Sequence, residues 1–516
     1  MTLSMEYIIK IFALVIGGLL FQTTYARDYI ATDFHVIGDG RTLNTEAFQK
    51  VIDKVSRDGG GRIILTAGKY LTGEINLKSN VEIHLEKDAV ILGSISPYDY
   101  FNVESKSAGD ELNDNAHLAL IVANGAKNIA ITGTGVIDGQ GRELALFADS
   151  LHHKGIYIDK HYNNRRQRPS ELVRPTLFYF YKTSGIRVED VYLRNSSNWG
   201  VSLNECDHVE FNHVDLFNRA YWNNDGIDIT DCSHVAIIGC NINSADDGIC
   251  LKSYNPESGN DSIRVRDCEI RSSASAVKFG TGSYGGFRHI EIRNIRVFDT
   301  FRSAIAIESV DGAVIDDILV DNISAVNTGN AIFIRLGKRG GNRKGVLKNV
   351  RLANISVQVP FNRPDINYDL RGPEVDYLHN IHPASICGLP GEYIENVILE
   401  NISITYPGRA TKGMAYLPLW RLSDIPEKED QYPEFSMFGE LPSWGFYVRH
   451  VRNLTFRNVH LSLADFDFRP AFVLDDAKNV TIENLSLPVS KNNSQVVLHN
   501  SSCRGDIPLS QIVNVP

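Results

Sequence analysis

The chain has 516 residues, of which 43% are hydrophobic, and its formal net charge is −10 at pH 7. A hydrophobic fraction of this size allows a large core, and the acidic balance argues against nucleic acid as a partner. No group of His and Cys residues has the spacing of metal ligands, so we expect neither a metal ion nor a cofactor.

The first residues resemble a cleavable export signal. Residues 8–21 form an apolar run that is too short for a comfortable membrane span, and Thr24-Tyr25-Ala26 places small residues at a cleavage site. We predict a signal peptide over residues 1–26, cleaved after about Ala26. The protein is then secreted or periplasmic, with no membrane span after processing; an uncleaved anchor is the alternative.

The remainder of the chain carries a repeat of four apolar residues at offsets 0, 2, 5 and 7. Period-two alternation within copies that lie about 23 to 28 residues apart is typical of a solenoid of short parallel strands, whereas helical repeats alternate near 3.6. The copies begin at Ile186, Val209, Val235, Ile263, Ile290, Ala313, Val397, Leu454 and Val480, with a weaker copy near Gly345.

Each copy is followed by a polar turn residue and then by a second short strand. The turn residues, such as Asn195, Asn218, Ser244 and Ser272, suit stacked turns whose side chains bond neighbouring backbone. The second strands begin at residues 200, 226, 248, 276, 304 and 331. We therefore predict an all-β solenoid of about ten coils, in one domain over residues 27–516, with a non-repeat excursion at about 360–450.

Three carboxylates occupy equivalent places in two successive copies. Asn223-Asn224-Asp225-Gly226 and Ala245-Asp246-Asp247-Gly248 align, so Asp225 should lie beside Asp247 and Asn224 beside Asp246. Converging carboxylates are what acid/base cleavage of a glycosidic bond requires, because one is a protonated acid while another activates water. The competing interpretation is structural, because Asp-Gly is a common turn pair.

At this point the chain resembles the glycoside hydrolase family of polygalacturonases and rhamnogalacturonan hydrolases, which are right-handed parallel β-helix enzymes acting on pectin. Gly38-Asp39-Gly40, Gly59-Gly60-Gly61 and Leu71-Thr72-Gly73 resemble the N-terminal cap of that superfamily, so we expect a short helical cap. The stretch from Lys278 to Arg288 resembles a bacterial branch of the family.

The resemblance assigns roles to the acidic residues. It implies Asp246 as general acid, Asp225 and Asp247 as the pair that holds and deprotonates the attacking water, and inversion of the anomeric centre. Inverting enzymes leave room for this water with a carboxyl separation of roughly 6.5 to 9.5 Å.

Two family motifs are missing. The family histidine of a Gly-His-Gly motif is Ser275 here, and an Arg-Ile-Lys motif is replaced by Ala306-Ile307-Glu308, which reverses a charge where galacturonate would sit. We therefore expect a rhamnogalacturonan-type substrate, with a neutral sugar near Glu308. The predicted substrate-binding residues are Asn224, Lys252, Ser275, Lys278, Glu308 and Arg335.

Other functions remain open. An exo-acting galacturonidase fits an excursion that closes one end of the cleft, with Trp444 and Tyr447 either stacking on sugars or, more simply, packing in the excursion core. A polysaccharide lyase would use the carboxylates to hold calcium. A non-catalytic carbohydrate-binding β-helix is the third alternative. We expect a monomer, in which a Cys206–Cys232 bridge is possible but not required by spacing.

Overall fold

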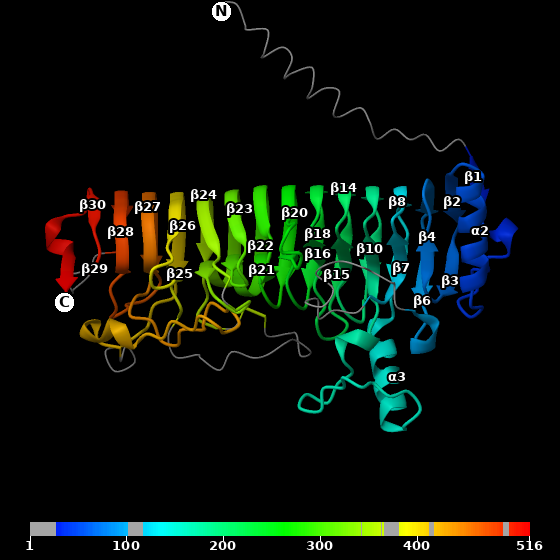
Figure 1. Cartoon of the computed structure of the whole chain (residues 1–516), viewed down its shortest axis with the longest axis horizontal. Coiled ribbons are helices and arrows are strands. Elements are labelled where there is room, and N and C mark those ends of the chain that lie inside the picture. Colours follow the sequence, from blue (N-terminus) through cyan, green and yellow to red (C-terminus); the bar gives the residue numbers. More distant parts are fainter. Residues whose placement is uncertain are drawn as a thin grey trace, which may run out of the picture.

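Stacked parallel strands form one long solenoid in the computed structural model (Figure 1). The described residues are 27–101, 117–341, 343–362, 364–365, 381–411, 417–488 and 495–516. The predicted signal peptide lies outside them. Among the described residues no helix has the length and apolar character needed to cross a membrane.

The strands form three ladders that run along the solenoid, and each ladder pairs the same strand of successive coils. The first ladder begins with β1 (Asp28–Ile30), β2 (Gly61–Leu65), β5 (Val81–Leu85), β8 (Lys127–Gly133), β11 (Ser184–Glu189), β14 (Asp207–Asn212) and β17 (Ser233–Ile238). The second begins with β3 (Gly68–Thr72), β6 (Ala89–Gly93), β9 (Val136–Asp138), β12 (Tyr192–Arg194), β15 (Asp215–Asn218) and β18 (Asn241–Ser244). The third contains β4 (Ile75–Leu77), β7 (Ala119–Asn124), β10 (Thr176–Tyr181), β13 (Val201–Asn204), β16 (Ile227–Thr230), β19 (Ile249–Ser253), β21 (Val277–Ser283), β25 (Ala384–Cys387), β29 (Val496–His499) and β31 (Ile512–Val515).

Longer strands continue from one ladder into the next toward the C-terminus. These are β20 (Asn260–Ser272), β22 (Gly286–Ser309), β23 (Val314–Leu336), β24 (Val346–Gln358), β26 (Ile394–Tyr406), β27 (Phe446–Leu463) and β28 (Phe472–Ser486), and the short β30 (Cys503–Gly505) ends the first ladder. The 3-10 helices are η1 (Ala31–Phe34), η2 (Pro97–Asp99), η3 (Glu171–Val173), η4 (Leu419–Asp424) and η5 (Leu509–Gln511).

Within the described residues, two α-helices accompany the solenoid. Helix α2 (Thr45–Arg57) packs against β2 and β4 at the N-terminal end, where Phe48 and Ile52 are buried, and it is the predicted cap (Figure 1). By covering the apolar N-terminal end of the solenoid core, it shields that end from water. Helix α3 (Gly141–His153) projects from one side of the solenoid.

The predicted register is confirmed for most coils. Ile227 pairs with Ile249, Ile249 with Val277, and Ile305 with Ile332, as the second-strand alignment requires. The inward residues of these strands are fully buried, because alternate side chains of a strand point to one face.

The register predicted from the repeat is wrong by five residues for the copies placed at Ala313 and Gly345. Ile290 pairs with Ile318 rather than with Ala313, and Ile318 pairs with Val350 rather than with Gly345. The offsets 0, 2, 5 and 7 match themselves after a shift of five, so a periodic pattern alone does not distinguish the two registers. The solenoid is also longer than about ten coils, since β2, β5 and β8 form coils ahead of Ile186.

Asparagine ladders support the turns of the first ladder. Asn401 has φ 56°, and its amide donates to Asn354 at 2.8 Å while its own oxygen accepts from Asn458 at 2.9 Å. Asparagine tolerates the left-handed conformation better than most residues, and its amide both donates and accepts. These residues therefore act as a stacked hydrogen-bonded column.

The cysteines and the excursion also differ in detail from a simple repeat. All seven cysteines are free, and Cys206 and Cys232 are buried neighbours without a bridge. Strands β25 and β26 belong to the regular ladders, so the excursion predicted at 360–450 is interrupted by a full coil. Its described later part includes η4 and returns to the solenoid at β27.

Candidate active site

The three carboxylates meet at the start of the third ladder. Asp225 lies two residues before β16, and Asp246 and Asp247 lie just ahead of Gly248 and β19, which pairs with β16. Their nearest carboxyl oxygens all lie within 4.8 Å of one another. The alignment of the two repeat copies therefore predicted their convergence correctly.

Close stacking of the two turns depends on glycine. A Cβ atom placed on Gly226 would lie 2.2 Å from the carbonyl oxygen of Gly248, which is far inside contact distance. The Asp-Gly pairs thus let adjacent coils approach closely enough to bring their carboxylates together.

The predicted polar turn column holds the backbone of these residues. Asn218 Nδ2 donates to the carbonyl oxygen of Asp225 at 2.8 Å. The hydroxyls of Ser244 and Ser272 donate to the carbonyl oxygen of Asp246 at 2.7 and 2.6 Å. Since Asn218 and Ser244 fix these carbonyls from the same coil and Ser272 from the next one, the carboxyl groups are preorganised.

Asp247 is held in its ionised form. Its Oδ1 accepts the backbone N–H of Ser275 at 3.0 Å, and its Oδ2 lies 3.0 Å from the Lys278 ammonium. Burial alone would raise the pKa of Asp247, but Lys278 and Arg302 outweigh it and lower that pKa below its ordinary value.

Asp246 and Asp225 are shifted in the opposite direction. Burial, followed by the adjacent charge of Asp247, raises the pKa of Asp246. Burial, followed by Asp228 and Asp246, raises the pKa of Asp225 well above its ordinary value. One protonated and one ionised carboxyl on neighbouring residues are the pair that acid/base chemistry needs.

The closest oxygens of the three acids lie within 4.8 Å of one another, whereas the roughly 6.5 to 9.5 Å expected for an inverting enzyme separates whole carboxyl groups, which is a longer measure. Asp225 favours the protonated form, so Asp247 is the better base of the two residues expected to share that role.

The carboxylates open into a cavity of about 330 Å³ with aromatic and charged walls. Its aromatic lining suits sugar rings, whose apolar faces pack on aromatic side chains. The lining residues are Glu171, Trp199, Asn223, Asp225, Asp246, Asp247, Lys252, Tyr254, Thr281, Gly282, Tyr284, Asp311, Arg339 and Tyr432.

Two insertions wall this cavity. Glu171 follows the α3 segment and Tyr432 lies in the excursion after η4, and both segments project from the same side of the solenoid (Figure 1). The excursion therefore reaches the carboxylates even though it is far away in the sequence.

Among the described residues, Lys252 is the one predicted substrate-binding residue that lines the cavity. Its ammonium lies 4.7 Å from the centre of the Trp199 ring and donates to the Thr281 carbonyl at 3.1 Å. Asp228 Oδ1 is 3.7 Å away. Lys252 is thus a cation at the cavity wall, as expected.

Asn224, Ser275 and Lys278 support the site from behind instead of lining it. Asn224 is fully buried and its amide donates to the carbonyls of Ser196 and Asn198, so it shapes the turn. Ser275 contributes its backbone N–H to Asp247, and Lys278 divides its ammonium between Asp247 and the Tyr432 hydroxyl at 2.9 Å.

Glu308 and Arg335 were predicted to face the sugar, and the structure corrects this. Glu308 is 2% exposed and lies beneath the excursion, where burial, opposed by Lys278, raises its pKa to about 8. Arg335 is 1% exposed and donates to the carbonyls of Gly388 and Glu427. Both residues are covered because the excursion folds over this stretch of the third ladder.

Sequence reasoning missed several residues of the site. Arg302 lies near Asp246 and Asp247 and pairs with Glu434 of the excursion at 2.9 Å. Arg339 and Tyr432 line the cavity from segments outside the repeat, where no periodic signal identifies them. Trp444 and Tyr447 are buried, which confirms the simpler interpretation that they pack in the core.

The carboxylate set is a poor cation site. Three oxygens within 4.8 Å would suit a hard cation such as calcium, but Lys278 already lies 3.0 Å from Asp247. A resident ammonium repels a metal ion, so the calcium-dependent lyase alternative loses its main support.

Comparison with known proteins identifies the domain. Residues 99–282, which include all three carboxylates, match the model of glycosyl hydrolases family 28. The chain contains a family 28 glycosyl hydrolase domain. A protein named "Probable polygalacturonase" from Vitis vinifera is 25% identical over 417 residues, covering 76% of this chain and 76% of its own length.

Further relatives of the family 28 domain agree with the fold. "Exo-poly-alpha-D-galacturonosidase" from Dickeya chrysanthemi is 24% identical and covers 88% of this chain and 73% of its own length. The crystal structure of an exopolygalacturonase from Thermotoga maritima aligns with a TM-score of 0.60 at 24% identity, covering 74% of this chain and 87% of that one. The chain is a glycoside hydrolase built on a right-handed parallel β-helix.

Proposed function

We propose that the chain hydrolyses glycosidic bonds of pectic polysaccharide, with Asp246 as general acid and Asp247 as the base that activates water. The observation that carries this proposal is the opposite pKa shift of two adjacent carboxyls at one cavity wall. The names of the related proteins support a pectic substrate.

The preferred substrate in this proposal is a rhamnogalacturonan-type chain, in which acidic and neutral sugars alternate. The lining of the cavity supports this preference, whereas Glu308 is buried and does not. Lys252 and Arg339 supply positive charge at separate points of the wall, among acidic groups that include Glu171 and Asp311. A wall of mixed charge suits one acidic sugar beside a neutral one better than a run of anionic sugars.

An exo-acting galacturonidase is the second candidate. Tyr432 of the excursion reaches the cavity, and a wall at one end favours cutting from a chain terminus. The Dickeya chrysanthemi relative carries the name of an exo-acting enzyme. The two candidates differ in the sugar that each accepts beside the cleaved bond.

We further propose single displacement with inversion. Ser275 and Lys278 engage both oxygens of Asp247, which stabilises it as a carboxylate that accepts a proton. Asp225 would then orient the water as its protonated form. Proton NMR of the first product formed gives the anomer directly, and retention would replace water by Asp247 as nucleophile.

The test of function is a product analysis in heavy-oxygen water. Purified protein is incubated with homogalacturonan and rhamnogalacturonan oligosaccharides, and the products are identified by mass spectrometry. We expect one labelled oxygen at each new reducing end and faster cleavage of rhamnogalacturonan. Faster release of single galacturonate residues would favour the exo-acting candidate. Unsaturated products would indicate a lyase, and binding without cleavage a carbohydrate-binding protein.

Export is part of the same proposal, because pectic polymers are met outside the cytoplasm. Residues 8–21 and the small residues before Arg27 support a signal peptide. N-terminal sequencing of the mature protein should begin near Arg27, and light scattering should give the mass of a monomer.

A further inference from the structure

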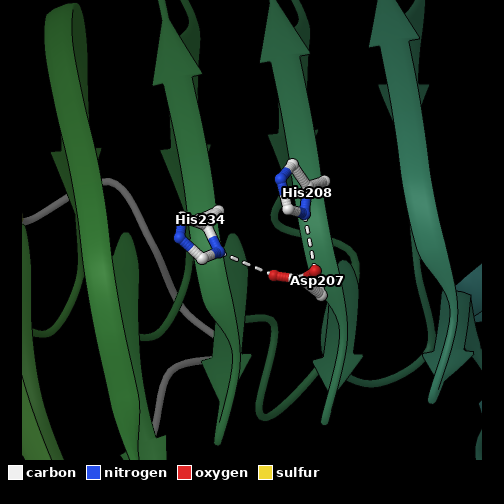
Figure 2. A group of neighbouring side chains, drawn as sticks. All are labelled: Asp207, His208 and His234. Carbon is white, nitrogen blue, oxygen red and sulfur yellow. Dashed lines mark hydrogen bonds and ion pairs between the residues drawn. The ribbon is translucent and has the colours of Figure 1, made fainter. Parts of the chain in front are cut away.

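Two histidines and an aspartate gather on the outer face of the first ladder. Asp207 and His208 begin β14, and His234 lies near the start of β17, the next strand of the ladder (Figure 2). Their potential ligand atoms lie within 4.8 Å of one another. None of the three is among the residues that line the active-site cavity, within the described chain.

The geometry of this cluster is convergent. Both imidazoles direct Nδ1 at the same carboxylate, at 2.5 Å for His208 and 2.8 Å for His234 (Figure 2). The rings stack with centroids 4.7 Å apart at an interplanar angle of 27°. The side chains are 55% and 57% exposed, so an ion can reach them from solvent.

These histidines depart from the pattern of their own column. One position before each inward residue of the first ladder, the chain adopts a left-handed conformation. The column runs through Asn128, Gly185, His208, His234, Ser262, His289, Asp317, Asn349, Asn396, Asn453 and Asn479. Toward the C-terminus the asparagines bond one another, as Asn453 does with Asn396 at 3.0 Å. The C-terminal part of this column is thus built of mutually bonded asparagines, whereas His208 and His234 share one carboxylate.

His208 and His234 stand on rigid backbone. Asp207 pairs with Ser233, and Val209 with Val235, on either side of the two histidines. The Ser233 hydroxyl donates to Asp207 Oδ1 at 2.7 Å and orients the carboxylate. Ladder pairing thus sets the spacing of the ligand side chains without help from flexible loops.

We propose that Asp207, His208 and His234 form a binding site for a divalent transition-metal ion such as Zn²⁺, Ni²⁺ or Cu²⁺. Two imidazole nitrogens and one carboxylate oxygen are a donor set that these ions prefer, and a water completes the coordination. Zn²⁺ would lie about 2.0 to 2.2 Å from each ligand, which separates ligand atoms by about 3.4 Å. The two Nδ1 atoms would have to move away from the carboxylate oxygens by on the order of 0.6 to 0.9 Å, and rotation of the exposed rings provides this movement.

Such an ion would cross-link two neighbouring coils. It would replace the direct imidazole–carboxylate contacts by metal–ligand bonds between β14 and β17. Because the ion would bind the folded chain and not the unfolded one, it would raise the melting temperature.

The test is calorimetric titration of the untagged full chain with ZnCl₂ and, separately, NiCl₂. We expect one site that is lost, or weakened at least tenfold, in the double variant His208→Asn, His234→Asn. Asparagine is chosen because the same column already accepts it. The matched control is His289→Asn, since His289 faces Asp261 alone, at 3.0 Å, and its loss should leave the affinity unchanged.

Two results would overturn the proposal. One is a site of equal affinity in the double variant, which would place the ion elsewhere, for instance on the active-site carboxylates. The other is an equal loss in His289→Asn. If the double variant does not fold, Cu²⁺ electron paramagnetic resonance of the wild-type chain decides, since two nitrogen ligands are expected and their absence would refute the site.

Discussion

At the scale of single residues, two adjacent carboxyls are driven to opposite protonation states by different neighbours. Asp247 faces Lys278 and Arg302, while Asp246 is buried next to the charge of Asp247 itself. The division of labour between acid and base thus comes from the cations placed behind one residue of the pair.

The first prediction separates the acid from the base. Asp247→Asn should lower kcat by about 10² to 10⁴ on every substrate, because the water loses its proton acceptor. Asp246→Asn should be equally impaired on the natural polymer but much less on an aryl glycoside, whose leaving group needs no proton. Steady-state kinetics on both substrates measure this difference. Equal losses on the aryl glycoside would contradict the assignment.

The second prediction concerns pH. Lys278 lowers the pKa of Asp247, so Lys278→Met should raise that pKa and leave the base protonated to higher pH. The acidic limb of the kcat/KM profile should therefore move to higher pH. Lys278→Arg keeps the positive charge and should restore much of the profile. An unshifted limb in the Met variant would show that Lys278 has only a structural role.

At the scale of elements, the turns determine the spacing of the coils, and side-chain columns determine the turns. Asn218, Ser244 and Ser272 fix the backbone carbonyls beside the carboxylates, while the asparagines of the other column bond one another through their side chains. The excursion acts differently, since it brings Tyr432 and Glu434 over the ladder and buries Glu308 beneath it.

The third prediction tests an asparagine column away from the site. Asn401→Ala should lose both amide hydrogen bonds and also the tolerance of φ 56°. Asn401→Gly loses the same bonds but keeps that tolerance. The alanine variant should be the less stable by about 1 to 2 kcal/mol, measured by denaturation. Equal stability of the two variants would mean that backbone strain is relieved by a local shift.

At the scale of the whole molecule, the solenoid buries acidic groups that contribute to its pH dependence. Burial raises the pKa of Glu308 to about 8, above its ordinary value of 4.5. The protonated form is therefore favoured by folding, and this stabilisation is lost as the pH rises from the ordinary value toward 8.

The fourth prediction follows from that sign. Glu308→Gln is neutral at every pH, so its melting temperature should fall less between about pH 5 and about pH 8 than that of the wild type. The free energy of unfolding should fall more steeply with pH in the wild type than in the variant, by at most about 1.4 kcal/mol per pH unit. Differential scanning calorimetry across this range measures it. Parallel curves would show that Glu308 is ionised in the folded protein.

Much of the site was predictable because a solenoid converts sequence spacing into contact. Once Val201, Ile227 and Ile249 are in register, the residues just before them must be neighbours, and the three carboxylates follow. The same logic failed at Ala313 and Gly345, where the repeat matches itself after a shift of five residues. Pairing of the whole strand is then needed to choose the register.

Sequence by itself determined the solenoid and the meeting of Asp225, Asp246 and Asp247, because both depend on periodicity along neighbouring coils, while the N-terminal cap was expected from the family resemblance. Tertiary structure alone decided which polar side chains reach the cavity, because segments without periodicity cover Glu308 and Arg335 and add Tyr432 and Arg339. It also decided that Asp207, His208 and His234 converge, since the direction of a side chain depends on its turn conformation and on the strand beside it.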